Sequence, residues 1–520
     1  MVLRRWGRSV EKLGEGRLAA GHFVRSCGRF ASRWAGRCPM VGVSLIKTAR
    51  VAANVFGLVI GTLVIGAMAL GGLEAKGETV PVAGDPARGY RLLVDTPFLP
   101  TDFTEEVFDN VWQSWPEPLK EQAAKADAAG RRRMAFERYG LTPRAETPQE
   151  KLPGDPLQYV VTTDPKDGTR SWTMNCFSCH GGTVYGDPYP GAPNNRFALQ
   201  TMTEELRATK LRMAKPLSRM DLGAFVIPLG TTHGTTNAVI FGIGLMARRD
   251  AELNVIDGVP ETLEHHDMDA PPWWHFHKRP YLYIDGFAQK GHRGLMQFTL
   301  VPENGPDFYR GHEDDFRDIH AYLMSLRPPK YPFAIDATLA ARGEAVFGKS
   351  CASCHGTYGE GGSYPNVRVP LDEIGTDPVR LKALPVDGRR KYAESWFAVD
   401  ASGGRQETVV DPDGYVAPPL DGVWASAPYL HNGSVPTLWH LLRPKERPAV
   451  WVPTDPGIDQ ERIGLTVRVV ERVPLTETDI AKRRQYFDTR RAGKSNRGHD
   501  YPDELSEADK EAVLEYLKTL

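Results

Sequence analysis

The pentapeptide CFSCH at residues 176–180 and its second copy, CASCH at residues 351–355, determine how the whole chain is interpreted. In each copy two residues separate a pair of cysteines, and a histidine follows the second cysteine directly. The two thiols can add across the vinyl groups of a haem, and the adjacent imidazole can bind the iron from one side. The sequence therefore predicts two covalently attached haem c groups.

The attachment residues follow from the two motifs. Only two of the six cysteines lie outside them, Cys27 and Cys38, which leaves no cysteine of the main body for a disulfide. A zinc site or a redox dithiol is the competing interpretation, but two pairs 175 residues apart, each followed directly by histidine, suit haem better than zinc. The predicted thioether and proximal residues are Cys176, Cys179, His180, Cys351, Cys354 and His355.

An internal repeat around the motifs predicts two domains. Residues 314–326, DDFRDIHAYLMSL, and the C-terminal residues 506–520, SEADKEAVLEYLKTL, both have the pattern of the helix that closes a cytochrome c domain. Tyr322 and Tyr516 occupy equivalent places in them. Gly343 is expected to allow close packing of the helix before the second motif against Tyr516, whereas the residues before the first motif look strand-like.

The domain boundary is expected in the proline-rich residues 327–332, which cannot continue a helix. We therefore predict an N-terminal haem c domain over residues 80–332 and a C-terminal haem c domain over residues 333–520. With 51 Gly and 41 Pro, the chain is expected to have long loops. The predicted fold class is mainly α, with two c-type cytochrome domains preceded by a transmembrane helix.

The N-terminal part of the chain has the pattern of a membrane anchor. Residues 51–72 form an uncharged, mostly apolar stretch of 22 residues, which is long enough to span a bilayer as a helix. Residues 1–50 carry eleven Arg and Lys against two Glu, so they are predicted to stay in the cytoplasm. The body is then placed on the periplasmic side of the bacterial inner membrane. The alternative is a cleaved signal peptide that leaves a soluble periplasmic protein.

The charge of the body argues against one class of partner. The whole chain has a net charge of −1, and the basic leader accounts for +9, so the remaining 470 residues sum to −10. The body has no basic cluster interleaved with aromatic residues. Nucleic acid is therefore excluded as an expected partner.

The second haem is expected to have two imidazole ligands. All twelve methionines lie at or before Met324, so the C-terminal domain cannot supply the methionine that raises a haem potential. Its further histidines are His431, His440 and His499. We prefer His499 as the second ligand, because it lies in a glycine-containing loop just before the closing helix, and His431 is the alternative.

The first haem has no clear second ligand. The N-terminal domain offers many methionines and histidines, and the sequence does not choose among them or require one. Residues 271–298 are rich in aromatic side chains that could surround an apolar pocket over an open iron. A buried aromatic core is an equally good interpretation of each of these residues taken singly.

Three segments carry a family resemblance: GVWASAPYLHNGSVPTLWHLL at 422–442, EIGTDPVRLKAL at 373–384, and residues 487–520. They resemble the rubber-oxygenase-like dihaem c-type cytochromes, which are related to the bacterial dihaem cytochrome c peroxidase superfamily. The resemblance implies two helical haem domains face to face, with the N-terminal haem open to oxygen and the C-terminal haem held by two histidines.

The resemblance also implies particular residue roles. His180 and His355 would be the proximal ligands, and His499 would be the distal ligand of the second haem. Phe298 and Tyr283 would line the oxygen side of the first haem, and they are the predicted catalytic residues. A calcium ion between the domains is a further expectation.

The expected function is that of a haem oxidoreductase acting on O2 or peroxide, oxygenase-like or peroxidase-like. The first haem would be the reaction site, and the second would relay electrons from or to a donor or acceptor protein. No residue stands out as the distal acid or base that peroxide cleavage needs. The alternative is a membrane-anchored electron-transfer cytochrome without substrate chemistry of its own.

Overall fold

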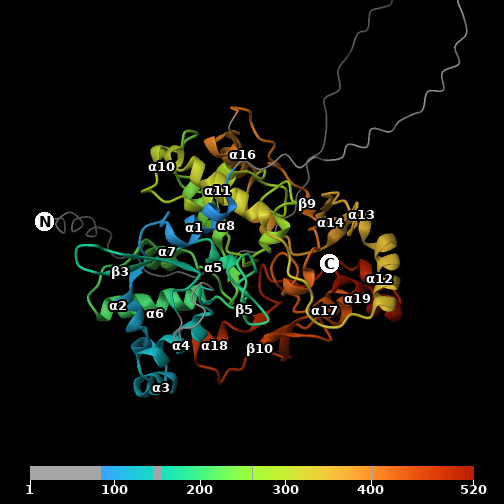
Figure 1. Ribbon diagram of the computed structural model, residues 1–520, viewed down its shortest axis with the longest axis horizontal. Coiled ribbons are helices and arrows are strands. Elements are labelled where there is room, and N and C mark those ends of the chain that lie inside the picture. The colour runs from blue at the N-terminus through green and yellow to red at the C-terminus, as the bar shows by residue number, and fades with distance from the viewer. Residues whose placement is uncertain (1–83, 145–153, 261, 401) are drawn as a thin grey trace, which may run out of the picture. The chain divides into compact units, whose positions relative to one another are not determined.

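Two pairs of packed helices come from the parts of the chain before and after the proline-rich residues 327–332 (Figure 1). The computed structural model describes residues 84–520 except 145–153, 261 and 401. The first pair packs an N-terminal helix on a helix just before the proline-rich stretch, and the second pair packs the helix before the second haem motif on the last helix. They are α1 (Pro86–Asp95) with α11 (Glu313–Ser325), and α12 (Ala337–Ser350) with α19 (Glu507–Leu517).

The two helix pairs use the same contact. In each pair a glycine, Gly89 in α1 and Gly343 in α12, lies so close to a backbone carbonyl of the partner helix that a Cβ atom would overlap it. The next neighbour of the missing Cβ is a tyrosine Cβ, that of Tyr322 or Tyr516, at 2.9 Å in both pairs. The two halves of the chain therefore repeat one helix crossing.

Three of these four helices begin at a capping side chain, and α11 does not. Asp85 accepts a hydrogen bond from the backbone of the first turn of α1, Asp336 does so for α12, and Ser506 does so for α19. A capping side chain satisfies backbone N–H groups that have no partner inside the helix, and this stabilises the helix start by about 1 kcal/mol.

The chain enters the first motif from a β-sheet. The sheet has the order β1-β3-β2, and its last strand in sequence leads within two residues into the short helix α5 (Phe177–His180). The indole of Trp172 is fully buried in this sheet against Phe103 and Phe108. The strands are β1 (Phe103–Thr104), β2 (Tyr159–Thr163) and β3 (Arg170–Met174).

The chain enters the second motif directly from α12, because α13 (Ala352–His355) follows one residue after it. A second three-stranded sheet, of order β11-β10-β12, lies in the C-terminal half. Two-stranded pairs complete the β structure. The strands are β10 (Val450–Asp459), β11 (Gly464–Val469), β12 (Phe487–Asp488), β4 (Thr183–Val184), β5 (Asp187–Pro188), β6 (Thr235–Thr236), β7 (Met268–Asp269), β8 (Arg368–Pro370) and β9 (Gly414–Val416).

Short helices joined by long loops make up the rest of the described chain. The remaining α-helices are α2 (Glu105–Asp109), α3 (Leu119–Lys125), α4 (Ala128–Tyr139), α6 (Leu199–Arg212), α7 (Arg219–Val226), α8 (Ala238–Met246), α9 (His292–Met296), α10 (Pro306–Gly311), α14 (Leu371–Ile374), α15 (Val379–Ala383), α16 (Val386–Glu394), α17 (Leu438–Leu441) and α18 (Ile480–Arg483). The 3-10 helices are η1 (Val111–Ser114), η2 (Trp273–His275), η3 (Gln297–Thr299), η4 (Trp396–Ala398), η5 (Val423–Ala425), η6 (Pro444–Glu446) and η7 (Tyr501–Glu504).

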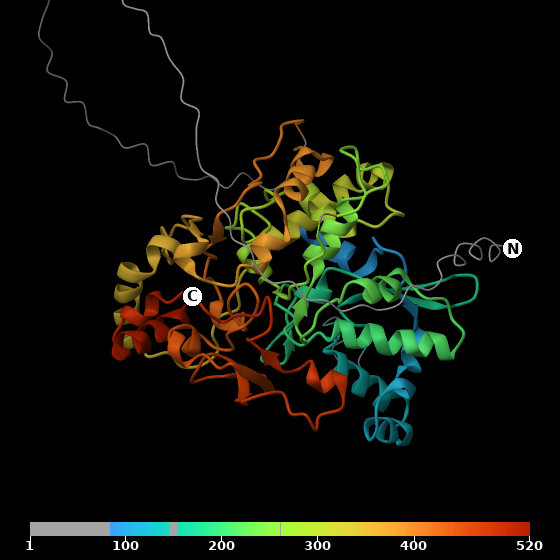
Figure 2. The ribbon, with the colours of Figure 1, turned by 180° about the vertical axis from the view of Figure 1, so that it is seen from behind.

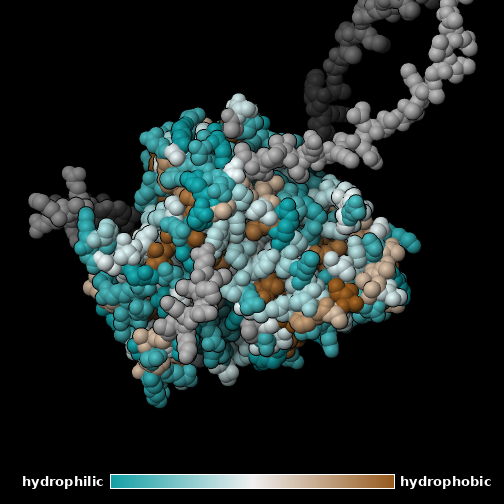
Figure 3. All heavy atoms as spheres, viewed as in Figure 1, coloured by the Kyte–Doolittle hydropathy of each residue, from teal (hydrophilic) through white to brown (hydrophobic). Residues whose placement is uncertain are grey.

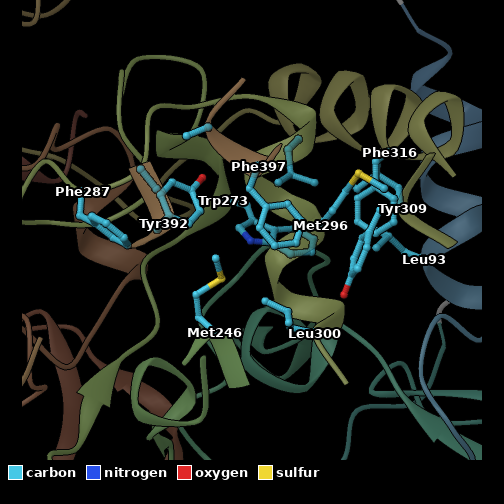
Figure 4. Close-up of a cluster of buried hydrophobic side chains, with 14 of the residues drawn as sticks. Leu93, Met246, Trp273, Phe287, Met296, Leu300, Tyr309, Phe316, Tyr392 and Phe397 are labelled. Carbon is cyan, nitrogen blue, oxygen red and sulfur yellow. The ribbon is translucent and has the colours of Figure 1, made fainter. Parts of the chain in front are cut away.

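One buried cluster joins residues from both halves of the chain. It runs from Leu93 and Phe316 through Trp273 to Phe287, and Tyr392 and Phe397 of the C-terminal half belong to it (Figure 4). Seen from behind, the orange segment that carries α16 lies beside the green and yellow helices of the N-terminal half (Figure 2). Residues 384–398 therefore contribute to a core made mainly by residues 93–323.

The described residues include no helix that is both long and apolar enough to cross a bilayer. The predicted anchor at 51–72 lies outside the described residues. On the face drawn in Figure 3, most residues are hydrophilic and the hydrophobic patches are small and separate.

Candidate haem sites

The two motif histidines are oriented in the same way. His180 Nδ1 lies 3.1 Å from the carbonyl oxygen of Pro271, and His355 Nδ1 lies 2.8 Å from that of Pro418. A carbonyl oxygen can only accept, so Nδ1 carries the proton and donates it. The Nε2 lone pair of each ring is then free to bind a metal, which is the arrangement that a second partner gives to a metal-binding histidine.

Burial keeps these imidazoles in the form that binds a metal. It lowers the pKa of His180 to about 4, and it also lowers the pKa of His355. Both rings are therefore neutral near pH 7, and a neutral imidazole is the ligand form.

The four motif cysteines are free and partly buried. Burial raises the pKa of Cys176 to about 12 and that of Cys351 to about 11, so without a ligand both thiols keep their protons. In the part of the chain that the structure describes, no three His, Cys, Asp or Glu side chains cluster as a metal site would need. The calcium ion stays a prediction.

The second site has an imidazole on each side of a space of suitable width. The ring centroids of His355 and His499 are 6.1 Å apart, and the rings are inclined by 67°. Two metal–imidazole bonds of about 2 Å, with roughly 1 Å from each nitrogen to its ring centre, span about 6 Å. The two rings therefore fit an iron between them. His431 lies elsewhere, with its ring centroid 4.4 Å from that of Tyr415.

A strained loop holds His499 in place. His499 has a φ of +52° and Gly498 has a φ of +80°, both in the left-handed region. Arg447 donates hydrogen bonds to the carbonyls of Asn496 and Gly498 at 2.7 and 2.6 Å, and His499 N donates to Ile374 O at 2.7 Å. A non-glycine residue with positive φ persists only where its surroundings fix it, and such positions concentrate at functional sites.

The first site has aromatic neighbours instead. The Trp273 ring stacks on His180, with centroids 4.7 Å apart and planes inclined by 23°. Cys176 packs against the buried cluster of Figure 4, to which Trp273 and Phe287 belong. The surroundings of the first motif are thus apolar.

A cavity of about 260 Å³ adjoins this cluster. Tyr283 lines it, and the Tyr283 hydroxyl donates a hydrogen bond of 3.1 Å to Gln297 Oε1, another lining group. Phe298 lies next to Tyr283, with ring centroids 6.2 Å apart, and is 46% exposed. The structure therefore places the two predicted catalytic residues side by side. Apolar and aromatic side chains dominate the rest of the lining, including Ile243, Met246, Phe287, Leu300 and Tyr392.

A direct contact links the loops that support the two sites. Trp274, which follows the stacked Trp273, donates a hydrogen bond of 2.8 Å from Nε1 to Asp421 O. His275 Nε2 lies 2.7 Å from the same oxygen, and Lys278 Nζ lies 2.7 Å from Asp421 Oδ1. The chain after Pro271 therefore binds the chain after Pro418.

Sequence reasoning missed the residues that orient the proximal histidines. Pro271 and Pro418 each begin the pair of prolines in an Ala-Pro-Pro tripeptide, at 270–272 and 417–419, and this tripeptide occurs twice in the chain. The repeated tripeptide could therefore have been recognised in the sequence. The sequence-based prediction also missed α1, because its short pattern was not recognised as the counterpart of α12.

A comparison with known protein families supports the prediction of a cytochrome c domain. Residues 414–452 match the family model described as RoxA-like, cytochrome c-like. The matched segment contains Pro418, the hydrogen-bond acceptor of His355. The match supports a rubber-oxygenase-like cytochrome, and with it covalently bound haem c and a haem-containing oxidoreductase.

Two proteins of Sinorhizobium fredii (strain NBRC 101917 / NGR234) are similar to the chain. The uncharacterized protein y4iM is 30% identical, over 38% of this chain and 52% of its own length. The uncharacterized protein y4iJ is 32% identical, over 38% of this chain and 42% of its own length. The chain thus spans about half the length of these relatives.

Proposed function

We propose that the protein is an exported, mainly helical dihaem c-type cytochrome that acts as an oxidoreductase, with the first site reacting with O2 or peroxide and the second relaying electrons. The observation that carries the proposal is the difference between the two sites. His355 faces a second imidazole, that of His499. His180 stacks on Trp273 beside an apolar core that borders a cavity.

Haem c, when bound, supplies the redox chemistry, and the protein supplies its surroundings. At the first site His180 offers Nε2, because Nδ1 is occupied by Pro271 O. The mostly apolar lining of the cavity favours a small apolar substrate. Burial raises the pKa of Tyr283, so its hydroxyl keeps its proton and holds the side chain of Gln297. Phe298 flanks Tyr283 and limits the space beside it.

At the second site His355 and His499 would hold a haem iron from both sides, which would suit electron transfer without substrate binding. Trp273 contacts the His180 ring, and the adjacent Trp274 binds the loop that follows Pro418. These contacts form a continuous protein connection between the sites. They support exchange of electrons between them.

The location and partners follow from the sequence. Residues 51–72 would anchor the chain in the inner membrane, with the body on the periplasmic side. A second protein would donate or accept electrons at the second site. Nothing in the charge of the body favours nucleic acid.

Carbon monoxide titration of the reduced full-length holoprotein tests the proposal. Pyridine haemochromogen analysis should first count two haems per chain. We then expect one carbon monoxide bound per chain, and turnover of hydrogen peroxide or of an alkene with O2. Two low-spin haems that both fail to bind carbon monoxide would contradict the proposal and leave the membrane-anchored electron-transfer cytochrome.

A further inference from the structure

A cluster of buried charges lies beside the cavity that Tyr283 and Phe287 line. The side chains of Asp285, Arg380 and Arg389 are each at most 1% exposed. Arg389 Nη2 donates a hydrogen bond of 2.7 Å to Asp285 Oδ2, and Arg380 Nη1 lies 3.1 Å from the same oxygen. Two cations therefore share one anion, and the cluster keeps a net positive charge inside the protein.

Most donors of this cluster have no partner in the described part of the chain. Arg380 makes no hydrogen bond through Nε, Nη1 or Nη2, and Arg389 makes none through Nη1. A guanidinium group keeps its proton, and therefore its charge, even when it is buried. Asp285 balances only one of the two buried positive charges. An uncompensated buried charge is strongly destabilising, so we expect a second anion here.

The neighbouring imidazoles do not provide this anion, and they are neutral near pH 7. Burial, reinforced by the charge of Arg380, lowers the pKa of His431 to about 3. His266 has a buried Nε2 without a partner, and burial lowers its pKa to about 4. The guanidinium groups of Arg380 and Arg389 lie over the rings of Tyr283 and Phe287, 5.5 and 5.3 Å from the centroids, and these rings fix their orientation.

The cluster adjoins the cavity and the strand before Pro418. Ile284, the residue before Asp285, accepts a hydrogen bond of 2.6 Å from Val416 N, and Pro418, the acceptor of His355, follows two residues later. On the other side, Arg380 lies over the ring of Tyr283, which lines the cavity.

We propose that Arg380, framed by Asp285 and Arg389, binds a carboxylate. The planar fork of a guanidinium matches the two oxygens of a carboxylate. The carboxylate has two possible sources, a propionate of haem c or a small organic acid that enters the protein. The first source rests on the proposed haem content, and the second does not.

Three variants of the full-length holoprotein isolate this group. Arg380→Gln removes the charge, and Arg380→Lys keeps the charge but removes the fork. Arg390→Gln is the matched control, because Arg390 lies in the same helix as Arg389 and is 55% exposed, with Asp387 as its partner. The readouts are the thermal midpoint, both haem potentials by spectroelectrochemistry, and calorimetric titration with sodium octanoate.

A propionate ligand predicts one pattern. Arg380→Gln lowers the thermal midpoint and lowers the potential of one haem, because the uncompensated carboxylate stabilises ferric iron, and Arg380→Lys shifts the same potential by less. The wild type then shows no saturable octanoate binding.

A free organic acid as the ligand predicts a different pattern. The wild type binds octanoate, Arg380→Gln weakens that binding about tenfold or more, and both potentials stay unchanged.

The proposal is wrong if Arg380→Gln and Arg380→Lys match Arg390→Gln in both potentials and in octanoate titration, whatever their thermal midpoints. If Arg380→Gln does not mature, Arg380→Lys and the wild-type titration decide the question. None of these readouts uses carbon monoxide or turnover, so failure of the proposed function would leave them interpretable.

Discussion

The two candidate haem sites are alike on the proximal side and unlike everywhere else. In both, a short motif helix presents a histidine whose Nδ1 meets a proline carbonyl. Beyond that, the second site has His499 on a left-handed loop, whereas the first has Trp273 and an apolar cavity nearby. The difference teaches that the local motif sets the orientation of the proximal histidine, while distant loops set what surrounds it on the other side.

Replacing His499 should give the largest change, because it would make the second site resemble the first. We expect His499→Ala to leave the second haem with one imidazole, so that the reduced protein binds two carbon monoxide molecules per chain instead of one. Visible spectroscopy during the titration measures this. His431→Gln is the control and should keep the wild-type stoichiometry. A stoichiometry of one for His499→Ala would show that another group binds the iron.

The shared helix crossing can be broken separately in each half. Gly89→Ala and Gly343→Ala each place a Cβ against a partner carbonyl, and we expect each to lower the free energy of unfolding by about 3 kcal/mol. Chemical denaturation of the holoprotein measures the change. Gly348→Ala in the same helix as Gly343 is the control, because its Cβ meets nothing within 4 Å. Tolerance of one substitution but not the other would mean that the halves do not share this crossing.

The loop that carries His499 should be sensitive to its glycine. Gly498 has a φ of +80°, and a Cβ there would overlap the backbone of residues 374–376. We expect Gly498→Ala to cost about 2 kcal/mol and to produce a fraction of high-spin haem, visible by EPR. Gly361→Ala is the control: Gly361 has a similar φ of +75°, but a Cβ there would meet nothing within 4 Å. It measures the cost of backbone strain without the steric overlap. An unchanged EPR spectrum would contradict the account of the loop.

The carboxyl group of Asp102 is buried next to the end of β3, the strand that leads into the first motif. Changing it should have the smallest effect of these substitutions. Asp102 accepts a hydrogen bond from Met174 N, and burial raises its pKa to about 6. Because the pKa is higher in the folded than in the unfolded state, stability should be greatest below pH 4 and fall as the pH rises through 6. Asp102→Asn should therefore be more stable than the wild type at pH 8 by about 1 kcal/mol, with the difference shrinking towards pH 4. Thermal melts across this range measure it, and a constant difference would exclude Asp102 as the titrating group.

The sequence allowed prediction of what is local. The CxxCH motifs and the helices that contain Gly343 and Tyr516 are defined by residues close together in the sequence. Their spacing therefore identifies them without a structure. The loop that contains His499 and the absence of methionine from the C-terminal domain predict His499 opposite His355. The hydrogen bonds by which Arg447 holds this loop could not be predicted, because they join residues about 50 positions apart. The Asp285, Arg380 and Arg389 cluster could not be foreseen, because no spacing brings these residues together.

The segment 384–398 has a consequence for the evolution of the chain. Leu384, Tyr392 and Phe397 complete a core that the N-terminal half otherwise builds. Each half would leave an apolar surface exposed if it were separated at the proline-rich stretch 327–332. The two parts that carry the motifs are therefore not interchangeable modules. Recombination between relatives at that linker would give stable chains only where the two parts already match each other.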